Sequence, residues 1–208
     1  LVDVNVTASG LRLGTAQNGV NAETPTDTGR RLLVRVWGDR VEAVDAGDDA
    51  AGWLETQLGR PCRLVYMPDD SIRRVDGAYA GAGETVGFAD GFPLLLVSQA
   101  SLDDLNQRLG ETVPANRFRP NLIVAGTEPF AEDGWRRIRI GEMEFDVAKA
   151  CSRCVIPSII QETAERDPEI NRVLAGYRRR DGQIFFGQNL LYQRDGKLNV
   201  GDPVEVLA

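Results

Sequence analysis

Two cysteines separated by two residues form the most reactive cluster of side chains in this sequence, Cys151-Ser152-Arg153-Cys154. A structural zinc site normally has four cysteine or histidine ligands, and only Cys62 could add one, so zinc is disfavoured. A thioredoxin-like redox pair would open a helix after a strand, and Pro157 disfavours an immediate long helix. The plainer alternative is two small thiols buried in a loop. Arg153 favours a further interpretation, because a guanidinium beside a thiol stabilises the thiolate, the form that binds soft metals.

A second pair of polar side chains precedes an apolar strand-like segment, in Arg119-Pro120-Asn121. Proline fixes the turn, and side chains two residues apart point the same way from an extended chain. Such a pair can hold an anionic or heterocyclic ligand through fork-like hydrogen bonds. An arginine that neutralises a neighbouring carboxylate is an equally good explanation, and the residues alone leave both open.

The composition excludes several common chemistries. The 208 residues contain no histidine, which rules out Ser-His-Asp and Cys-His catalysis, Cys₂His₂ zinc sites and HExxH proteases. Asp and Glu number 31 against 24 Lys and Arg, a net charge of −7, so we expect no nucleic-acid partner. Without a long apolar run or an export signal we expect no membrane partner, a cytoplasmic location and free thiols on the three cysteines.

The elements that must position these residues are mostly short strands. Alternation and apolar runs predict strands near residues 2–6 (half-buried), 34–36, 41–44, 64–66, 94–97 and 122–124, a hairpin over 138–147, and two strands around Asp195-Gly196 before a final one over 203–207. Capping residues predict helices that begin at Asp48, Ser101 and Asp167. Five glycines between residues 67 and 92 predict a long loop. The pattern lacks βαβ alternation and therefore predicts an α+β, mostly β fold, an antiparallel or mixed barrel with peripheral helices.

Six segments in a fixed order resemble the MOSC domain family. They are Phe88 to Asn106, Asn116-Arg-Phe-Arg-Pro-Asn121, Phe130-Ala-Glu-Asp-Gly-Trp135, Ala150-Cys-Ser-Arg-Cys154, Phe186-Gly-Gln-Asn189 and Val200-Gly-Asp-Pro-Val204. Residues 1–66 are similar to the latter part of the smaller β-rich domain that precedes MOSC in many proteins. The resemblance therefore implies a partial N-terminal β-rich domain over 1–75 and a mixed β-barrel MOSC domain over 76–208. Within the family, the chain is most similar to bacterial MOSC reductases and to the mitochondrial amidoxime-reducing component.

The resemblance implies a molybdenum cofactor, a molybdopterin that carries Mo. It makes Cys154 the metal-ligating, catalytic thiolate, and it leaves Cys151 inessential. The residues that it places against the cofactor are Arg119, Asn121, Ser152, Arg153, Asp90, Gly91, Phe92 and Asn189. The reaction implied is the two-electron reduction of hydroxylamines and amidoximes, small N-oxygenated substrates, with electrons from an external electron-donor protein. Pyridoxal phosphate binding is a further family expectation.

Two departures from the family pattern qualify this expectation. The family usually follows its cysteine motif with Thr-Thr-Val-Asp, where this chain has Pro157-Ser158-Ile159-Ile160. The family's N-terminal Lys-Ser motif, which helps to hold the cofactor phosphate, is missing from these 208 residues. A different class of function is a sulfur-carrier or cofactor-handling module with a persulfide-forming cysteine beside Arg153. A third alternative is a chain that folds and binds nothing.

Overall fold

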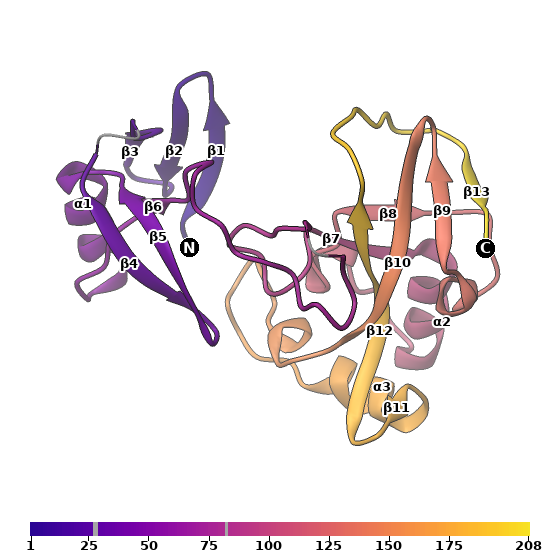
Figure 1. Cartoon of the computed structure of the whole chain (residues 1–208). Coiled ribbons are helices and arrows are strands. Elements are labelled where there is room, and N and C mark those ends of the chain that lie inside the picture. Colours follow the sequence, from indigo (N-terminus) through magenta and orange to yellow (C-terminus); the bar gives the residue numbers. More distant parts are fainter. Residues whose placement is uncertain (27–28, 82) are drawn as a thin grey trace. The chain divides into compact units, whose positions relative to one another are not determined.

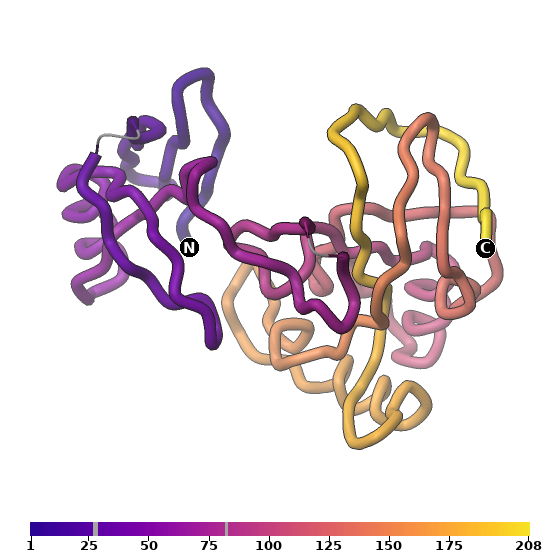
Figure 2. Tube along the Cα trace, viewed as in Figure 1, coloured from indigo at the N-terminus to yellow at the C-terminus, as the bar shows by residue number. Residues whose placement is uncertain are grey.

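The computed structural model describes residues 1–26, 29–81 and 83–208, and it divides the chain into two compact units. Unit 1 contains Leu1–Arg73 and Thr85–Asp90, and unit 2 contains Arg74–Glu84 and Gly91–Ala208. Figure 1 shows the elements of each unit, and Figure 2 traces the chain from one to the next. Among the helices of the described residues, none combines the length and the apolar character that crossing a membrane requires. The domain boundary that the resemblance implies between residues 75 and 76 stays a prediction.

Unit 1 contains two small antiparallel sheets and one helix. The first sheet joins β1 (Asp3–Thr7), β2 (Gly10–Gly14) and β3 (Gly19–Glu23), of which the sequence indicated only the first. The second joins β4 (Arg31–Val36), β5 (Asp39–Asp45) and β6 (Val65–Tyr66), and α1 (Asp48–Leu58) follows β5. The half-buried strand expected at residues 2–6 is wrong in its burial, because β1 is an edge strand and all five of its residues are exposed.

A buried carboxylate joins α1 to the second sheet of unit 1. Asp45 accepts bonds from Nε of Arg63 at 2.5 Å and from Nη2 of Arg63 at 3.0 Å, while Arg63 also reaches Asp48 at 2.6 Å. These bonds hold the pKa of Asp45 below its ordinary value of 3.8.

Unit 2 is built on a nearly closed, mixed seven-stranded sheet, which confirms the predicted mostly β, barrel-like fold. Its strands are β7 (Leu94–Ser98), β8 (Leu122–Val124), β9 (Arg137–Ile140), β10 (Met143–Ser152), β11 (Arg179–Arg180), β12 (Gln183–Tyr192) and β13 (Val204–Val206). They are ordered β13-β9-β10-β12-β7-β8, with β11 paired to β12 off this path. The helices are α2 (Gln99–Leu109) and α3 (Glu169–Tyr177), with short 3₁₀ turns at Ala115–Arg117, Ala131–Gly134 and Ile156–Ser158.

One crossover in unit 2 was not expected. Strands β7 and β8 pair in parallel, and α2 connects them, so this part of the chain is a βαβ unit. The sequence analysis predicted both strands and the helix between them, but a local pattern does not show that the two strands pair in parallel. The prediction of two strands around Asp195-Gly196 is also wrong in part, since β12 precedes that turn but residues 193–203 form no strand.

The two faces of this sheet pack against different apolar clusters. Leu96, Phe145 and Leu190 belong to the cluster enclosed by the sheet. On the outer face, Val97 and Phe186 pack with Phe118 and with α2 and α3. Leu96 and Val97 are adjacent in β7 and belong to different clusters, as a period of two requires. Phe186 and Leu190 of β12 are four residues apart and also belong to different clusters, so the alternation shifts between them, where Gly187 has φ +78°.

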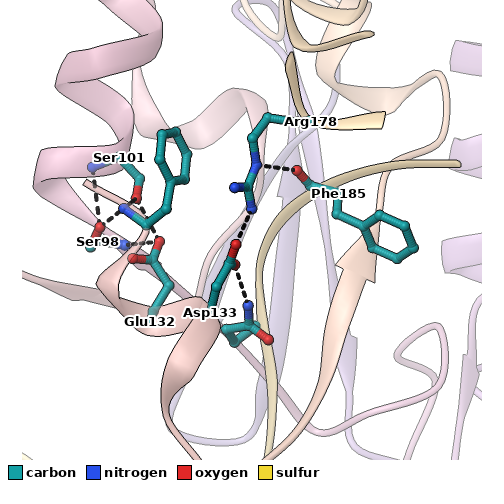
Figure 3. Close-up of polar contacts among 8 residues, drawn as sticks. Ser98, Ser101, Glu132, Asp133, Arg178 and Phe185 are labelled. Carbon is teal, nitrogen blue, oxygen red and sulfur yellow. Dashed lines mark hydrogen bonds and ion pairs between the residues drawn. The ribbon is translucent and has the colours of Figure 1, made fainter. Parts of the chain in front are cut away.

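The loop at Ala131–Gly134 is tied to the rest of unit 2 by two acidic side chains (Figure 3). Glu132 is buried and accepts hydrogen bonds from the Ser101 hydroxyl at 2.7 Å and from Ser98 N–H at 3.4 Å. Asp133 accepts bonds from Arg178 at 2.6 Å and from Gln188 at 2.7 Å. Two of the family-like segments, 130–135 and 186–189, therefore contact each other to hold β12 in place.

The start of α2 corrects one prediction from the sequence. Ser98, not Ser101, is the N-cap, and its side chain accepts a bond from Ser101 N–H at 3.1 Å. Ser101 lies inside the first turn, where its buried hydroxyl contacts Glu132. The local pattern could not separate the two serines, because the choice is made by a carboxylate 31 residues away.

Candidate functional site

The cysteine motif lies where β10 ends. Arg153 donates its backbone N–H to Ile184 O at 2.7 Å, which keeps this segment beside the start of β12. Its guanidinium donates from Nη1 to Cys151 Sγ at 3.0 Å and from Nη2 to Phe118 O at 3.0 Å. The buried Nε of Arg153 has no partner among the described residues. One donor of this fixed cation is therefore left for a further acceptor.

Cys154 is the exposed cysteine of the motif. Its sulfur accepts the N–H of Ile156 at 3.5 Å, and its carbonyl oxygen accepts Nδ2 of Asn171 at 3.0 Å. Asn171 also donates to Ser158 Oγ at 3.2 Å, so a residue of α3 holds both ends of the loop after the motif. The loop leads into a short 3₁₀ turn that contains Pro157, which confirms that no long helix follows at once. All three cysteines are free thiols, as expected.

A row of side chains crosses the outer face of the sheet near the motif. The ladder aligns Lys149 of β10 with Asn189 of β12, and Asn189 with Leu95 of β7. Asn121 extends this row beyond β7, because its N–H donates to Leu95 O at 2.9 Å and its Oδ1 accepts Leu95 N–H at 2.8 Å. These bonds use the Asn121 oxygen for structure and leave its Nδ2 to face a ligand.

The close approach at Gly187 fixes the register of this row. Gly187 has φ +78°, and a Cβ there would lie 2.7 Å from Leu96 O. A larger residue would push β12 away from β7 and displace Gln188 and Asn189 together.

The Arg119-Pro120-Asn121 turn differs from the extended geometry that the sequence predicted. Arg119 has φ 55°, because its N–H closes the preceding turn onto Asn116 O at 3.1 Å. Its side chain is exposed, and no carboxylate in the described part of the chain forms an ion pair with it. A left-handed, non-glycine residue before proline is strained, and such strain is concentrated at functional sites.

Arg117 has the structural role that the sequence analysis left open for Arg119. Arg117 is buried and donates to Pro157 O at 2.8 Å and to Asp167 at 3.2 Å. The sequence did not indicate this role, because Arg117 and Arg119 lie two residues apart in one short segment and nothing local shows which of them is buried.

The expected pocket loop is shared between the two compact units. Asp90 belongs to unit 1, where it accepts Trp37 Nε1 at 3.3 Å and its carbonyl accepts Arg73 Nη2 at 2.8 Å. Gly91 and Phe92 belong to unit 2. The Phe92 ring makes an edge contact with Tyr79 at 6.1 Å.

Of the remaining expected residues, Ser152 is exposed and pairs with Phe185 in the β10–β12 ladder. Ser152 thus ends β10, Arg153 and Cys154 follow it directly, and Asn121 and Asn189 share one row of the sheet. The assignment of these residues to a cofactor stays a prediction.

The donor set is suited to a metal that brings most of its own ligands. No cluster of three His, Cys, Asp or Glu side chains in residues 1–26, 29–81 and 83–208 could hold a metal ion. The exposed Cys154 thiol can instead contribute a single soft ligand to a preassembled anionic complex, to which the unpartnered Nε of Arg153 can donate.

Comparison with known proteins places this geometry in a family. Residues 83–205 match the family model of the MOSC domain, which confirms the resemblance. Mitochondrial amidoxime-reducing component 1 of Mus musculus is 35% identical, over 88% of this chain and 58% of the relative. The Homo sapiens protein of the same name is 33% identical, over 89% and 58%. The molybdenum cofactor sulfurase of Oryza sativa subsp. japonica is 34% identical, over 77% of this chain and 22% of the relative.

The chain spans about 58% of the length of these amidoxime-reducing relatives and 22% of the sulfurase. The relatives named here come from animals and a plant. They lend no support to a bacterial source or to pyridoxal phosphate.

Proposed function

Because the chain belongs to the MOSC domain family, we propose that it is a molybdenum-cofactor-dependent reductase of N-hydroxylated small molecules. Relatives named for amidoxime reduction and for the molybdenum cofactor support this proposal. The observation that carries it in this chain is the exposed Cys154 thiol directly after Arg153, whose guanidinium is held by Cys151 and Phe118 and keeps an unpartnered buried donor.

The residues present fit the cofactor by their donor chemistry. Cys154 would supply the protein's thiolate ligand, and the free Nε of Arg153 and Nδ2 of Asn121 would donate to the anionic pterin. Ser152, Arg119, Gly91, Phe92 and Asn189 would complete the binding surface, and Asp90 is kept as a further candidate. When bound, the cofactor supplies two-electron oxygen-atom chemistry at the metal.

The overall reaction is balanced without an acid or base from histidine. A hydroxylamine or amidoxime takes up two electrons and two protons, and it gives the amine or amidine and one water. We propose that the electrons come from a separate redox protein and the protons from solvent, because the chain holds no histidine. The three free thiols support a reducing compartment such as the cytoplasm.

The test is metal and pterin content after expression in a host that makes the cofactor. Wild type and Cys151→Ala should carry molybdenum and pterin, and Cys154→Ala should lose the metal. Reduction of benzamidoxime with a chemical electron donor should follow the metal content. Full molybdenum loading in Cys154→Ala, or none in wild type, would contradict the proposal.

A second function has one observation in its favour. An Arg153 guanidinium nitrogen lies 3.0 Å from the Cys151 sulfur, and some relatives are named molybdenum cofactor sulfurases. A sulfur-carrier role predicts that this cysteine takes one sulfur atom from a sulfane-sulfur donor and becomes a persulfide, which is a mass increase of about 32 Da. Mass spectrometry that finds both motif cysteines unmodified would exclude the carrier role.

A further inference from the structure

One of the two lysines in the chain lies between residues expected at the site. The Lys149 ammonium lies 4.3 Å from the centre of the Tyr79 ring, and this ring contacts Phe92. In the sheet, Lys149 is aligned with Asn189. The lysine therefore connects the aromatic side of the loop at 91–92 with the polar row on the outer face.

The position of Lys149 along β10 places it at working distance from the cysteine motif. Lys149 lies three positions before Ser152 in the chain, and a strand rises about 3.3 Å per residue, so the Cα atoms of these two residues lie about 10 Å apart or less. Register shifts around Ala148 and Cys151 shorten this path further. A planar molecule with one group at Cys154 and another at Lys149 can bridge such a distance with the reach of a lysine side chain.

The charge on Lys149 is not neutralised by the protein. In the described part of the chain, the ion pairs of unit 2 are made by arginines, among them Arg117, Arg139 and Arg178. Lys149 makes no ion pair there, although the chain carries 31 acidic residues. A half-buried lysine whose ammonium lies on an aromatic ring and forms no ion pair with a carboxylate can bind an anionic ligand.

We propose that Lys149, supported by Tyr79, binds an anionic group of the substrate and selects carboxylated aromatic N-hydroxylated compounds. This inference rests on the proposed reductase function, since it names the substrate class of the same site. The Tyr79 and Phe92 rings form the aromatic wall, and Lys149 fixes the end of the substrate remote from the reacting nitrogen.

The kinetic test compares benzamidoxime with 4-carboxybenzamidoxime. Wild type should prefer the carboxylated compound, and Lys149→Met should lower that preference in kcat/KM about tenfold through KM, the effect of one charge-assisted contact. The exposed Lys197→Met is the matched control, because it removes the same charge and should leave the preference unchanged. An unchanged preference in Lys149→Met, or an equal loss for both compounds, would overturn the inference.

A binding test separates this inference from the reductase proposal. With only two lysines, acetylation of the holoprotein can be located by mass spectrometry. The carboxylated compound should slow acetylation of Lys149 but not of Lys197, and the neutral compound should slow neither. Absence of protection overturns the inference even if the enzyme reduces benzamidoxime, whereas protection without turnover supports it while the reductase proposal fails. A drop in molybdenum and pterin content in Lys149→Met would assign the ammonium to the cofactor and reject the substrate role.

Discussion

Replacing Asn171 by aspartate tests whether α3 positions the cysteine loop. Asparagine and aspartate have similar helix propensities and similar shapes, so the exchange replaces the Nδ2 donor with an acceptor oxygen and adds one negative charge. That donor makes two hydrogen bonds, to Cys154 O and to Ser158 Oγ. Two neutral hydrogen bonds contribute about 1–3 kcal/mol together, and facing carboxylate and carbonyl oxygens adds a repulsion to their loss.

The expected result is local loosening of the segment from Cys154 to the start of α3. Hydrogen exchange of its amides should accelerate about 5- to 150-fold, the equivalent of 1–3 kcal/mol. Alkylation of Cys154 should also become faster. Lowering the pH through the ordinary aspartate pKa of about 3.9 should reduce the difference from wild type, because a protonated aspartate regains one donor.

Asn171→Ala is the informative companion variant. Alanine loses both bonds, but it gains about 0.6 kcal/mol of helix propensity and removes the buried Oδ1 that has no partner among the described residues. We therefore expect Asn171→Ala to be closer to wild type than Asn171→Asp. If Asn171→Asp exchanges and reacts like wild type, Asn171 does not donate to the loop and the positioning argument is refuted.

Two further predictions follow from the arginines and their partners. Arg117→Met should destabilise unit 2 by about 3 kcal/mol or more in urea unfolding, because it leaves a buried carbonyl and Asp167 unpaired. Arg119→Met should change the free energy of unfolding by no more than about 0.5 kcal/mol and lower only the cofactor content. Equal stability of the two variants would contradict this division. The Arg63 contact lowers the Asp45 pKa, so this pair stabilises the folded state above the ordinary carboxyl range and the contribution is lost as the pH falls through the folded pKa. The urea midpoint of Asp45→Asn should therefore lie below that of wild type at pH 7 and converge with it below about pH 4; a constant gap down to pH 3 would reject the linkage.

Most elements of the fold could be predicted from local patterns, because each is encoded in a short window. The hairpin of β9 and β10 and the helix that ends at Gly59 follow from alternation and from a left-handed cap. The burial of β1 could not be predicted, since an edge strand and a central strand share the same alternation. The predicted N-cap of α2 was also wrong, because the Ser101 hydroxyl donates to Glu132, which lies in a distant loop that the local pattern does not show.

The site shows the same limit. The segment Cys151 to Cys154 is contiguous, and its chemistry is visible in the sequence. Asn171 lies 17 residues from Cys154 in the chain, and Tyr79 lies 70 residues from Lys149, so only the folded chain brings each pair together. Neither residue has a type or spacing that distinguishes it from ordinary surface positions.

The cations of this chain separate by burial and partner, not by type. Arg73 and Arg117 are buried and donate to carbonyls and carboxylates of the protein, so they hold loops in place. Arg153 is intermediate, with two donors fixed by the protein and one unpartnered. Lys149 contacts only an aromatic face among the described residues, so its charge remains available. Because an unpartnered, partly desolvated charge is costly to keep, we propose that Lys149 on β10 and Arg153 directly after it face the ligand.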